Sequence, residues 1–429
     1  MNELPTGWIE APLSELGSEI RGSTLPVAGL VYELYSVPTF ATRRPETVDG
    51  SQIGSTKRPV RPGDVLLCKI NPRINRVWVV ADPLEPGREQ IASTEYLVLR
   101  ATDPDLSRYL MWYLRSPVFR DWIKLSVEGA TGSHTRSKSG PILKQRVPLS
   151  PLNEQRRIVA AIEEHLSRLD AADASLVQAK RRMEAFVRAT VVSALDGDWR
   201  LVALSDVTES QVYGTSSKAS FDPDGVPVLR MGNINAGRLD LRNLKYLPSD
   251  HPDVAKFTLE LGDVLFNRTN SPELVGKSAV FTGSEPMTFA SYLIRVRLAS
   301  DCDPRWAVLV INGPPGRRYI ASVRSQQVGQ ANVNGTKLAA MPIPLPPLEE
   351  QQRIVAEVEE RLLVIDAMQA SIERAQRRSA ALRRSILERA FSGELVPQDP
   401  SDEPASVLLD HIRAERPDKD THKGHKSTK

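Results

Sequence analysis

The stretch VPLSPLNEQRRIVA at residues 147–160 returns as IPLPPLEEQQRIVA at residues 343–356, which is 196 positions later. The two copies align without a gap as far as Gly197 and Gly393, and about half of the aligned residues are identical. Such a repeat identifies the building unit of a fold before any single motif is considered. The chain is therefore predicted to consist of two similar halves.

Each copy of the repeat has the pattern of one long helix. Prolines precede both copies, and none follows before Pro223 and Pro397, which suits helices because proline is tolerated before a helix but not inside it. Apolar residues recur at steps of three, four and seven, which places them on one helix face. This stripe comprises Ile158, Ile162, Leu166, Leu169, Leu176, Met183 and Val187 in the first copy, and Ile354, Val358, Leu362, Ile365, Ile372 and Leu382 in the second.

The length of the two helices limits how their stripes can be buried. About 44 residues at about 1.5 Å each give roughly 66 Å, which exceeds the usual helix of a globular domain. We predict that the helices pack on one another as an antiparallel coiled coil. The alternative is that each helix folds onto its own domain. Gly197 and Gly393 stand where a left-handed helix C-cap favours glycine.

The segments outside the helices repeat more loosely. PGDVLLCKIN at residues 62–71 is answered by LGDVLFNRTN at residues 261–270, and ASTEYLVLR at residues 92–100 by ASYLIRVR at residues 290–297. The predicted organisation is a first globular domain (residues 1–146), a central helical segment (147–197), a second globular domain (198–342), a distal helical segment (343–397) and a partly disordered C-terminal extension (398–429). The polar, lysine-rich stretch from His411 onward is expected to be disordered.

The globular segments have mixed secondary-structure signals. Alternating apolar residues predict short strands at residues 65–67, 77–79, 96–98, 264–266 and 294–296, and helices are expected at residues 109–124 and 306–310. The fold class is therefore α+β: two mixed α/β domains separated by two long helices, with pseudo-two-fold symmetry between the halves.

Composition excludes several classes of protein. The chain has 429 residues, of which 41% are hydrophobic, and no apolar run approaches the roughly 20 residues needed to cross a bilayer. The N-terminus has no secretory signal pattern. Two distant cysteines, Cys68 and Cys302, exclude a disulfide framework and favour a reducing cytoplasm.

Positive charge is unevenly placed, although the formal net charge is only +3. Residues 129–153 and 304–348 contain no acidic residue, and residues 57–76 contain six basic residues against Asp64 alone. Local positive fields of this kind suit a polyanion. The alternative for any one stretch is an ordinary solvated surface.

Motif-like strings give no support for catalysis or metal binding. NGPP at residues 312–315 lacks the aromatic residue of an amino-methyltransferase loop, and SPELVGKS at residues 271–278 lacks the first glycine of a phosphate loop. The six histidines show no metal-ligand spacing. We predict a binding protein with no catalytic residue and no metal site.

Loop residues in matching positions of the two domains favour DNA recognition. Amide side chains bond bidentately to adenine, and Arg or Lys to guanine, whereas other polar contacts hold phosphates. Lys69 and Asn71 follow a strand where Arg268 and Asn270 follow its counterpart. The full candidate set is Lys57, Arg58, Lys69, Asn71, Arg73, Arg76, His134, Arg136, Lys138, Tyr213, Lys218, Arg230, Asn233, Asn235, Asn267, Arg268, Asn270, Gln330, Asn332, Asn334 and Lys337. The alternative for each single residue is a solvated loop position.

The pattern Pro-Leu-x-x-Gln-x-x-Ile-Val at both helix starts and AFSGEL at residues 390–395 resemble the specificity subunit of type I restriction-modification enzymes. The resemblance implies a non-catalytic subunit whose globular domains recognise the two halves of an asymmetric DNA site. It implies helices that act as a spacer and dock two methyltransferase subunits. It also implies that S-adenosylmethionine, ATP and Mg are used by the partners, which include translocase-endonuclease subunits, and that this chain binds no cofactor.

Two other classes of function stay open at this stage. The chain could be a coiled-coil scaffold that gathers partner proteins and binds no DNA, in which case duplex binding would be absent or insensitive to salt. It could also be an enzyme whose site carries no recognisable motif. Cleavage or methylation of DNA by the purified chain alone would establish that third class.

Overall fold

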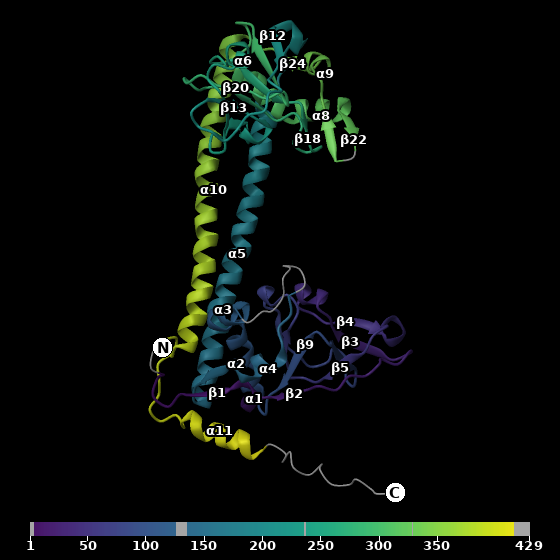
Figure 1. The fold of residues 1–429 in the computed structure, drawn as a ribbon, viewed down its shortest axis with the longest axis vertical. Helices are drawn as coiled ribbons and strands as arrows, with labels where there is room; N and C mark the ends of the chain where they lie inside the picture. Colours follow the sequence, from purple (N-terminus) through teal and green to yellow (C-terminus); the bar gives the residue numbers. More distant parts are fainter. Residues whose placement is uncertain (1–3, 126–134, 236, 328, 416–429) are drawn as a thin grey trace. The chain divides into compact units, whose positions relative to one another are not determined.

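The computed structural model describes residues 4–125, 135–235, 237–327 and 329–415, and it divides into two compact units. Unit 1 comprises Met1–Leu176 and Arg374–Lys429, and unit 2 comprises Val177–Glu373. Each unit therefore contains one globular domain and one end of each long helix, α5 (Leu152–Ala194) and α10 (Leu348–Phe391) (Figure 1). The predicted domain boundaries themselves stay a prediction.

The globular part of unit 1 is built on two four-stranded sheets with strand orders β2-β9-β6-β7 and β4-β3-β8-β5, and on the pair β1-β10. Its strands are β1 (Ile9–Pro12), β2 (Ser18–Glu19), β3 (Val31–Tyr35), β4 (Glu46–Asp49), β5 (Lys57–Val60), β6 (Val65–Cys68), β7 (Val77–Val79), β8 (Glu89–Ser93), β9 (Tyr96–Arg100) and β10 (Arg146–Leu149). Its helices are α1 (Leu13–Leu16), α2 (Pro104–Arg115), α3 (Pro117–Leu125), α4 (Ser139–Lys144) and α11 (Ala405–Ala414), with short 3-10 helices η1 (Pro38–Thr42), η2 (Gly50–Gln52) and η3 (Pro72–Ile74).

Unit 2 has the sheet β12-β21-β17-β19, the three-stranded sheets β16-β13-β20 and β18-β23-β22, and the pairs β11-β24 and β14-β15. Its strands are β11 (Leu201–Ala203), β12 (Thr208–Tyr213), β13 (Val226–Leu229), β14 (Ile234–Asn235), β15 (Arg238–Leu239), β16 (Lys245–Leu247), β17 (Val264–Asn267), β18 (Thr269–Asn270), β19 (Ser278–Val280), β20 (Thr288–Phe289), β21 (Leu293–Leu298), β22 (Ser325–Gln327), β23 (Gln330–Asn332) and β24 (Pro342–Pro344). Its helices are α6 (Pro252–Phe257), α7 (Pro304–Asn312), α8 (Pro314–Val323), α9 (Gly335–Ala339), η4 (Leu204–Val207) and η5 (Met231–Asn233).

The internal repeat extends through the globular domains as a shared sheet topology. Val65 of β6 pairs with Leu99 of β9, and the matching Val264 of β17 pairs with Val296 of β21 in the same antiparallel register. Every strand that we predicted is present. The predicted helix at residues 109–124 corresponds to α2 and α3, and α3 begins at Pro117. The predicted helix at residues 306–310 is the middle of α7, after which α8 begins at Pro314.

The two long helices pair within each unit. In unit 1, Ile158 and Ile162 of α5 share one hydrophobic core with Ala390 and Phe391 of α10. Farther along α5, Asp170 and Asp173 accept from Arg383 of α10 at 2.8 Å. Residue numbers thus rise along α5 while those of its contacts on α10 fall, so the two helices are antiparallel. In unit 2, Ile354 and Val358 of α10 likewise share a core with Ala194 and Leu195.

Two arrangements were considered for the apolar stripe: packing of the helices on each other, and packing of each helix on its own domain. The structure contains both. The first turns of each helix pack on the adjoining globular domain, and the last turns of the other helix pack beside them. Most of the predicted stripe is buried or half-buried. Leu382 is the exception, because 43% of it is exposed. The antiparallel pairing is therefore confirmed, whereas the pseudo-two-fold relation between the halves stays a prediction.

Two expectations were wrong: that Gly197 is a left-handed helix C-cap, and that the C-terminal tail is disordered from His411 onward. The rest of that tail, residues 416–429, lies outside the described residues. Gly393 has a left-handed φ of 78°, as expected of a C-cap, but Gly197 does not. Gly197 is needed for space instead, because an added Cβ would lie 2.4 Å from the Trp199 ring. The start of the supposed disordered tail at His411 belongs to helix α11, whose Leu409 and Ile412 are buried in the unit 1 core beside α1 (Figure 1).

Candidate nucleic-acid interface

Lys69 and Arg268 occupy equivalent positions just after strands β6 and β17. The Lys69 N–H donates to the Glu95 carbonyl at 2.9 Å, and the Arg268 N–H donates to the Tyr292 carbonyl at 3.0 Å. Their own carbonyls accept from Ser137 and Val333, respectively, at 3.0 and 2.9 Å. The backbone therefore holds the same corner in both domains, as the sequence alignment predicted.

In unit 1 this corner is cationic and hollow. A cavity of about 420 Å³ is lined by Lys69, Arg136, Ser137, Lys138 and Ser139. Burial lowers the pKa of the Lys69 ammonium, and the neighbouring charges of Arg58 and Arg136 push it in the same direction. Burial also lowers the pKa of Lys57. Arg136 forms an ion pair with Glu95.

The loop after Lys69 presents further candidates. Asn71 and Asn75 both have left-handed backbone conformations, with φ of 48° and 51°, and between them the short helix η3 exposes Arg73. Asn71 is anchored by its N–H, which donates to the Thr135 carbonyl at 2.9 Å. The Arg58 side chain donates to the Ile20 carbonyl at 2.8 Å, and Arg76 is half-buried.

In unit 2 the same corner is filled by an aromatic ring. The Arg268 guanidinium lies 4.7 Å from the centre of the Tyr213 ring, and the Tyr213 hydroxyl accepts from the Gly335 N–H at 2.7 Å. Asn332 donates to the Thr269 hydroxyl at 2.7 Å.

Two more amides of this corner are used locally. Asn270 accepts from the N–H of Ser271 at 2.8 Å. Asn334 caps α9 by accepting from the N–H of Lys337 at 2.9 Å.

Several sequence candidates lie inside the protein. Asn233 is 3% exposed, accepts from the Arg230 N–H at 2.9 Å and donates to the Asp240 carbonyl at 2.8 Å, so its amide holds its own loop together. Asn267 is fully buried at the end of β17. Lys218, Asn235 and Gln330 are exposed, whereas His134 lies outside the described residues.

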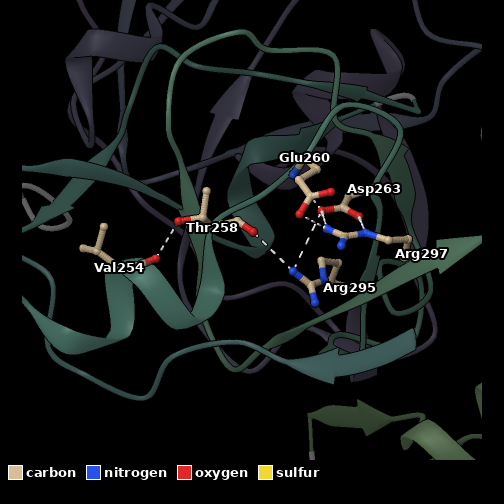
Figure 2. Close-up of polar contacts among 6 residues, drawn as sticks. All are labelled: Val254, Thr258, Glu260, Asp263, Arg295 and Arg297. Carbon is tan, nitrogen blue, oxygen red and sulfur yellow. Dashed lines mark hydrogen bonds and ion pairs between the residues drawn. The ribbon is translucent and has the colours of Figure 1, made fainter. Parts of the chain in front are cut away.

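A buried ion-pair cluster was not recognised from the sequence. Asp263, which is 1% exposed, accepts from Arg297 at 2.9 and 3.2 Å and lies 4.0 Å from the Arg295 guanidinium (Figure 2). The hydrogen bond to Asp263 raises the pKa of Arg297. In unit 1, Asp64 and Arg100 form the same two hydrogen bonds at 2.8 Å. In the sequence, the only indication of these ion pairs was the Gly-Asp dipeptide that both halves share at residues 63–64 and 262–263.

The rest of this cluster ties a helix to the sheet. Arg295 donates to the Thr258 carbonyl at 3.2 Å, and the Thr258 hydroxyl donates to the Val254 carbonyl at 2.6 Å (Figure 2). Because Val254 belongs to α6 and Arg295 to β21, the cluster positions α6 against the sheet that carries Arg268. The cluster therefore affects the candidate interface only through the position of this sheet.

The proposed partner stripe is mostly turned inward. Ile158, Ile162, Ile354, Val358 and Ile365 are buried, and Leu166, Leu169, Leu176, Leu362 and Ile372 are half-buried. Other apolar side chains on the parts of α5 and α10 in unit 2 are exposed. These are Phe186 at 54%, Val192 at 51%, Leu363 at 60%, Val364 at 54% and Met368 at 56%.

The catalytic-looking string at residues 312–315 has a structural role. Asn312 accepts from the N–H of Ser278 at 3.0 Å and donates to its carbonyl at 2.9 Å, which fastens α7 to β19. Within the described residues, no group of three or more His, Cys, Asp or Glu side chains is placed to hold a metal ion. In the same part of the chain, no helix is long and apolar enough to cross a membrane.

Comparison with known proteins identifies relatives along almost the whole chain. Residues 196–374 match a family model described as the type I restriction modification DNA specificity domain. The chain is 25% identical to the type I restriction enzyme EcoKI specificity subunit of Escherichia coli K12, with 96% of both chains covered. It is 24% identical to the StySPI specificity subunit of Salmonella potsdam, again over 96% of each chain.

Solved structures share the fold. A chain from a study of complex assembly and conformational transition of the type I R-M system has a TM-score of 0.76 at 22% identity, over 92% of this chain and all of that one. The HsdS subunit of Thermoanaerobacter tengcongensis has a TM-score of 0.56 at 22% identity, over 92% of this chain and 99% of its own. Over nearly its whole length the chain is therefore similar to type I restriction enzyme specificity subunits, and residues 196–374 match the DNA specificity domain of that family.

Proposed function

We propose that this chain gives a type I restriction-modification complex its DNA specificity, with each globular domain contacting one half of a bipartite site. The observation that carries the proposal is the equivalent placement of Lys69 and Arg268 in two domains of the same topology. Arg and Lys at such positions suit guanine edges in the major groove or phosphates of the DNA backbone. Because the loops around them differ, the two half-sites differ as well.

The long helices in this proposal set the gap between the half-sites and dock two methyltransferase subunits. Exposed apolar side chains such as Phe186, Leu363 and Met368 support a docking role, because clustered exposed apolar residues mark interaction surfaces. The inward-facing stripe, by contrast, serves the pairing of the helices themselves.

Chemistry belongs to the partners in this proposal. The chain itself is non-catalytic and binds no cofactor, and it works in the cytoplasm. The methyltransferase subunits use S-adenosylmethionine and extrude the target adenine from the helix. Translocase-endonuclease subunits use ATP and Mg.

A domain exchange tests the proposal. Residues 1–146 are replaced by the corresponding domain of another specificity subunit, the complex is reconstituted with its methyltransferase subunits, and methylated adenines are mapped in exposed DNA. We expect one half-site to change while the other, read by residues 198–342, stays the same. A chimera that still methylates the original sequence would contradict the proposal.

Point substitutions give an independent test. Lys69→Ala and Arg268→Ala should each weaken specific binding by the assembled complex by about tenfold, which is the effect of about 1.4 kcal/mol. Lys144→Ala is the matched control, because Lys144 is exposed at the end of α4, away from the corner. Equal affinity of all four proteins, measured by titration of a labelled duplex, would count against these two positions.

A further inference from the structure

The Arg268 side chain leaves a backbone that is fixed on both sides. The Arg268 N–H donates to the Tyr292 carbonyl at 3.0 Å, and its carbonyl accepts from the Val333 N–H at 2.9 Å. Arg268 directly follows β17, which lies between β21 and β19 in its sheet. The direction of the guanidinium therefore depends on the side chain alone.

One aromatic ring restricts that side chain. The Arg268 guanidinium carbon lies 4.7 Å from the centre of the Tyr213 ring, which is within the range of a cation–π contact. Tyr213 ends β12, and its hydroxyl accepts from the Gly335 N–H at 2.7 Å. An added Cβ on Gly335 would lie 3.0 Å from this hydroxyl, so the glycine permits the close approach. The ring is thus held at both ends, by its strand and by Gly335.

The outer end of the Arg268 guanidinium stays accessible. Its Nη1 donates to the Ser291 carbonyl at 3.5 Å, which is a weak hydrogen bond. The Nε atom is buried without a partner. The Nη2 atom neither donates to another described residue nor shares this burial. A ligand can therefore reach the arginine at its Nη1–Nη2 end and not at Nε.

This end of the guanidinium matches the edge of a guanine. Guanine presents two acceptors, O6 and N7, in the major groove, and two N–H groups of one arginine can bond to both. An arginine that is already held by a ring loses less side-chain freedom when it binds. A held arginine also adapts poorly to another base, whose edge would leave its donors unpaired. The ring thus favours discrimination between bases.

The first domain has a different arrangement at the equivalent place. By strand register, Arg21 stands there where Tyr213 stands in the second domain. The Arg21 side chain is 78% exposed and pairs with Glu19. The cation at the corner is Lys69, whose ammonium is a point donor on a flexible chain and lacks the planar fork of arginine. The ring over the cation is therefore a feature of the second domain only.

We propose that Tyr213 is a positioning residue that aims the Nη1–Nη2 end of Arg268 at one guanine of the second half-site. Tyr213 acts through Arg268 and contacts no base itself. The inference rests on the proposed function and deepens it, because it names the pair of side chains that makes one base position specific.

Binding by the complete complex with its methyltransferase subunits tests the inference. Each base pair of the half-site that stays unchanged in the domain exchange is replaced in turn, and each guanine also by 7-deazaguanine, which lacks the N7 acceptor. We expect one guanine at which wild type discriminates by about tenfold and Arg268→Ala does not. Tyr213→Leu should lose most of the discrimination at that guanine and keep it at the other positions.

Further variants separate the ring from the fold. Tyr213→Phe keeps the ring and should retain most of the discrimination, whereas Tyr213→Gln, a second variant without a ring, should lose it. Tyr213→Leu combined with Arg268→Ala should match Arg268→Ala alone, because the ring acts through the arginine. Phe221→Leu is the matched control: the Phe221 ring lies 4.9 Å from the Lys245 ammonium, beside the sheet β16-β13-β20. This control should keep the wild-type discrimination.

The possible failures of the inference and of the proposed function are distinguishable. If Tyr213→Leu and Tyr213→Gln weaken binding to all duplexes equally, or if Phe221→Leu loses as much discrimination as they do, the positioning role is overturned. If Arg268→Ala changes discrimination at no base pair, the guanine contact is overturned while the proposed function stands. Absence of sequence-specific binding by the wild-type complex overturns the proposed function itself.

Discussion

Asp64 and Asp263 each hold an arginine of the neighbouring strand, at the start of the strand that leads to Lys69 or Arg268. Both aspartates are 1% exposed, and both accept two hydrogen bonds from their arginine. A buried carboxylate destabilises a protein unless it is paired with a cation. Each aspartate therefore requires its arginine to be present. The positions of Lys69 and Arg268, a few residues farther on, depend on these pairs.

Asp263→Asn should destabilise unit 2 by about 2–4 kcal/mol, because Arg295 and Arg297 would lose their common partner. The expected loss lies below that of a fully buried pair, since the Arg297 side chain is 29% exposed. Asp366→Asn is the control: its pair with Arg238 is more than half exposed and should contribute little. Thermal unfolding of the three proteins measures the difference, and equal transitions would contradict the role assigned to Asp263.

Cys302 should be protected from alkylation in the folded protein. Burial, helped by the charges of Asp301 and Asp303, raises the pKa of the Cys302 thiol to about 12. Because the thiolate is the reactive form, the alkylation rate of the unfolded chain should be half-maximal near pH 9 and level off above pH 10, whereas the rate of the folded chain should still rise steeply there. Site-resolved mass spectrometry after pulses of iodoacetamide measures both profiles. Coincident profiles would show that the thiol is not shielded.

The same shift links Cys302 to stability. Its pKa is raised in the folded state, so the unfolded chain releases the proton first as pH rises. The thiol therefore contributes to stability below its ordinary pKa of 9.0, and this contribution is lost as pH rises through the folded-state pKa of about 12.

At the scale of single elements, a buried glutamine secures the start of each long helix. Gln155 donates to the Ser150 carbonyl, and Gln351 donates to the Pro346 carbonyl, both at 2.8 Å and both five residues back. Gln351 also donates to the Asp301 carbonyl at 2.9 Å and accepts from the Asp303 N–H at 2.8 Å. The glutamine of the repeated motif therefore joins the helix to the preceding proline turn.

Gln351→Ala should destabilise unit 2 by about 1–3 kcal/mol, because buried backbone groups of residues 301, 303 and 346 would lose their partner. Gln352→Ala is a matched control, since the neighbouring Gln352 is exposed. Urea denaturation followed by fluorescence measures both variants. If both variants unfold at the same urea concentration, Gln351 does not stabilise the junction between the helix and the proline turn.

At the scale of the whole molecule, the proposed spacing role predicts that the length of the helices determines the number of base pairs between the two half-sites. Seven residues inserted between Leu176 and Val177, and seven more between Glu373 and Arg374, lengthen both helices by about 10.5 Å. This corresponds to about three base pairs. Methylation mapping should therefore find the same half-sites farther apart.

Insertion into α5 alone serves as the comparison. It leaves the two helices unequal in length. The contacts of Asp170 and Asp173 with Arg383 in unit 1, and the core that Ala194 shares with Ile354 in unit 2, then cannot both be kept, so we expect modification to be lost or strongly reduced. An unchanged spacer in the variant with both insertions would contradict a spacing role for the helices.

The sequence by itself determined the repeat, both long helices and the strand on either side of the interface corner. These follow from local rules, namely proline placement, apolar periodicity and strand alternation, which need no knowledge of distant neighbours. The matched positions of Lys69 and Arg268 followed from alignment of the two halves. The family resemblance then supplied the expected function.

Only the tertiary structure decided which candidates face solvent and which are used inside the protein. Asn233 holds its own loop, Tyr213 closes one corner, and the tail from His411 begins in a helix because Ile412 finds an apolar surface on unit 1. The last two outcomes depend on partners far away in the chain, because Tyr213 contacts Gly335 and Ile412 packs in the core of the first domain. Local sequence carries no record of such contacts, so burial and pairing emerge only when the chain has folded.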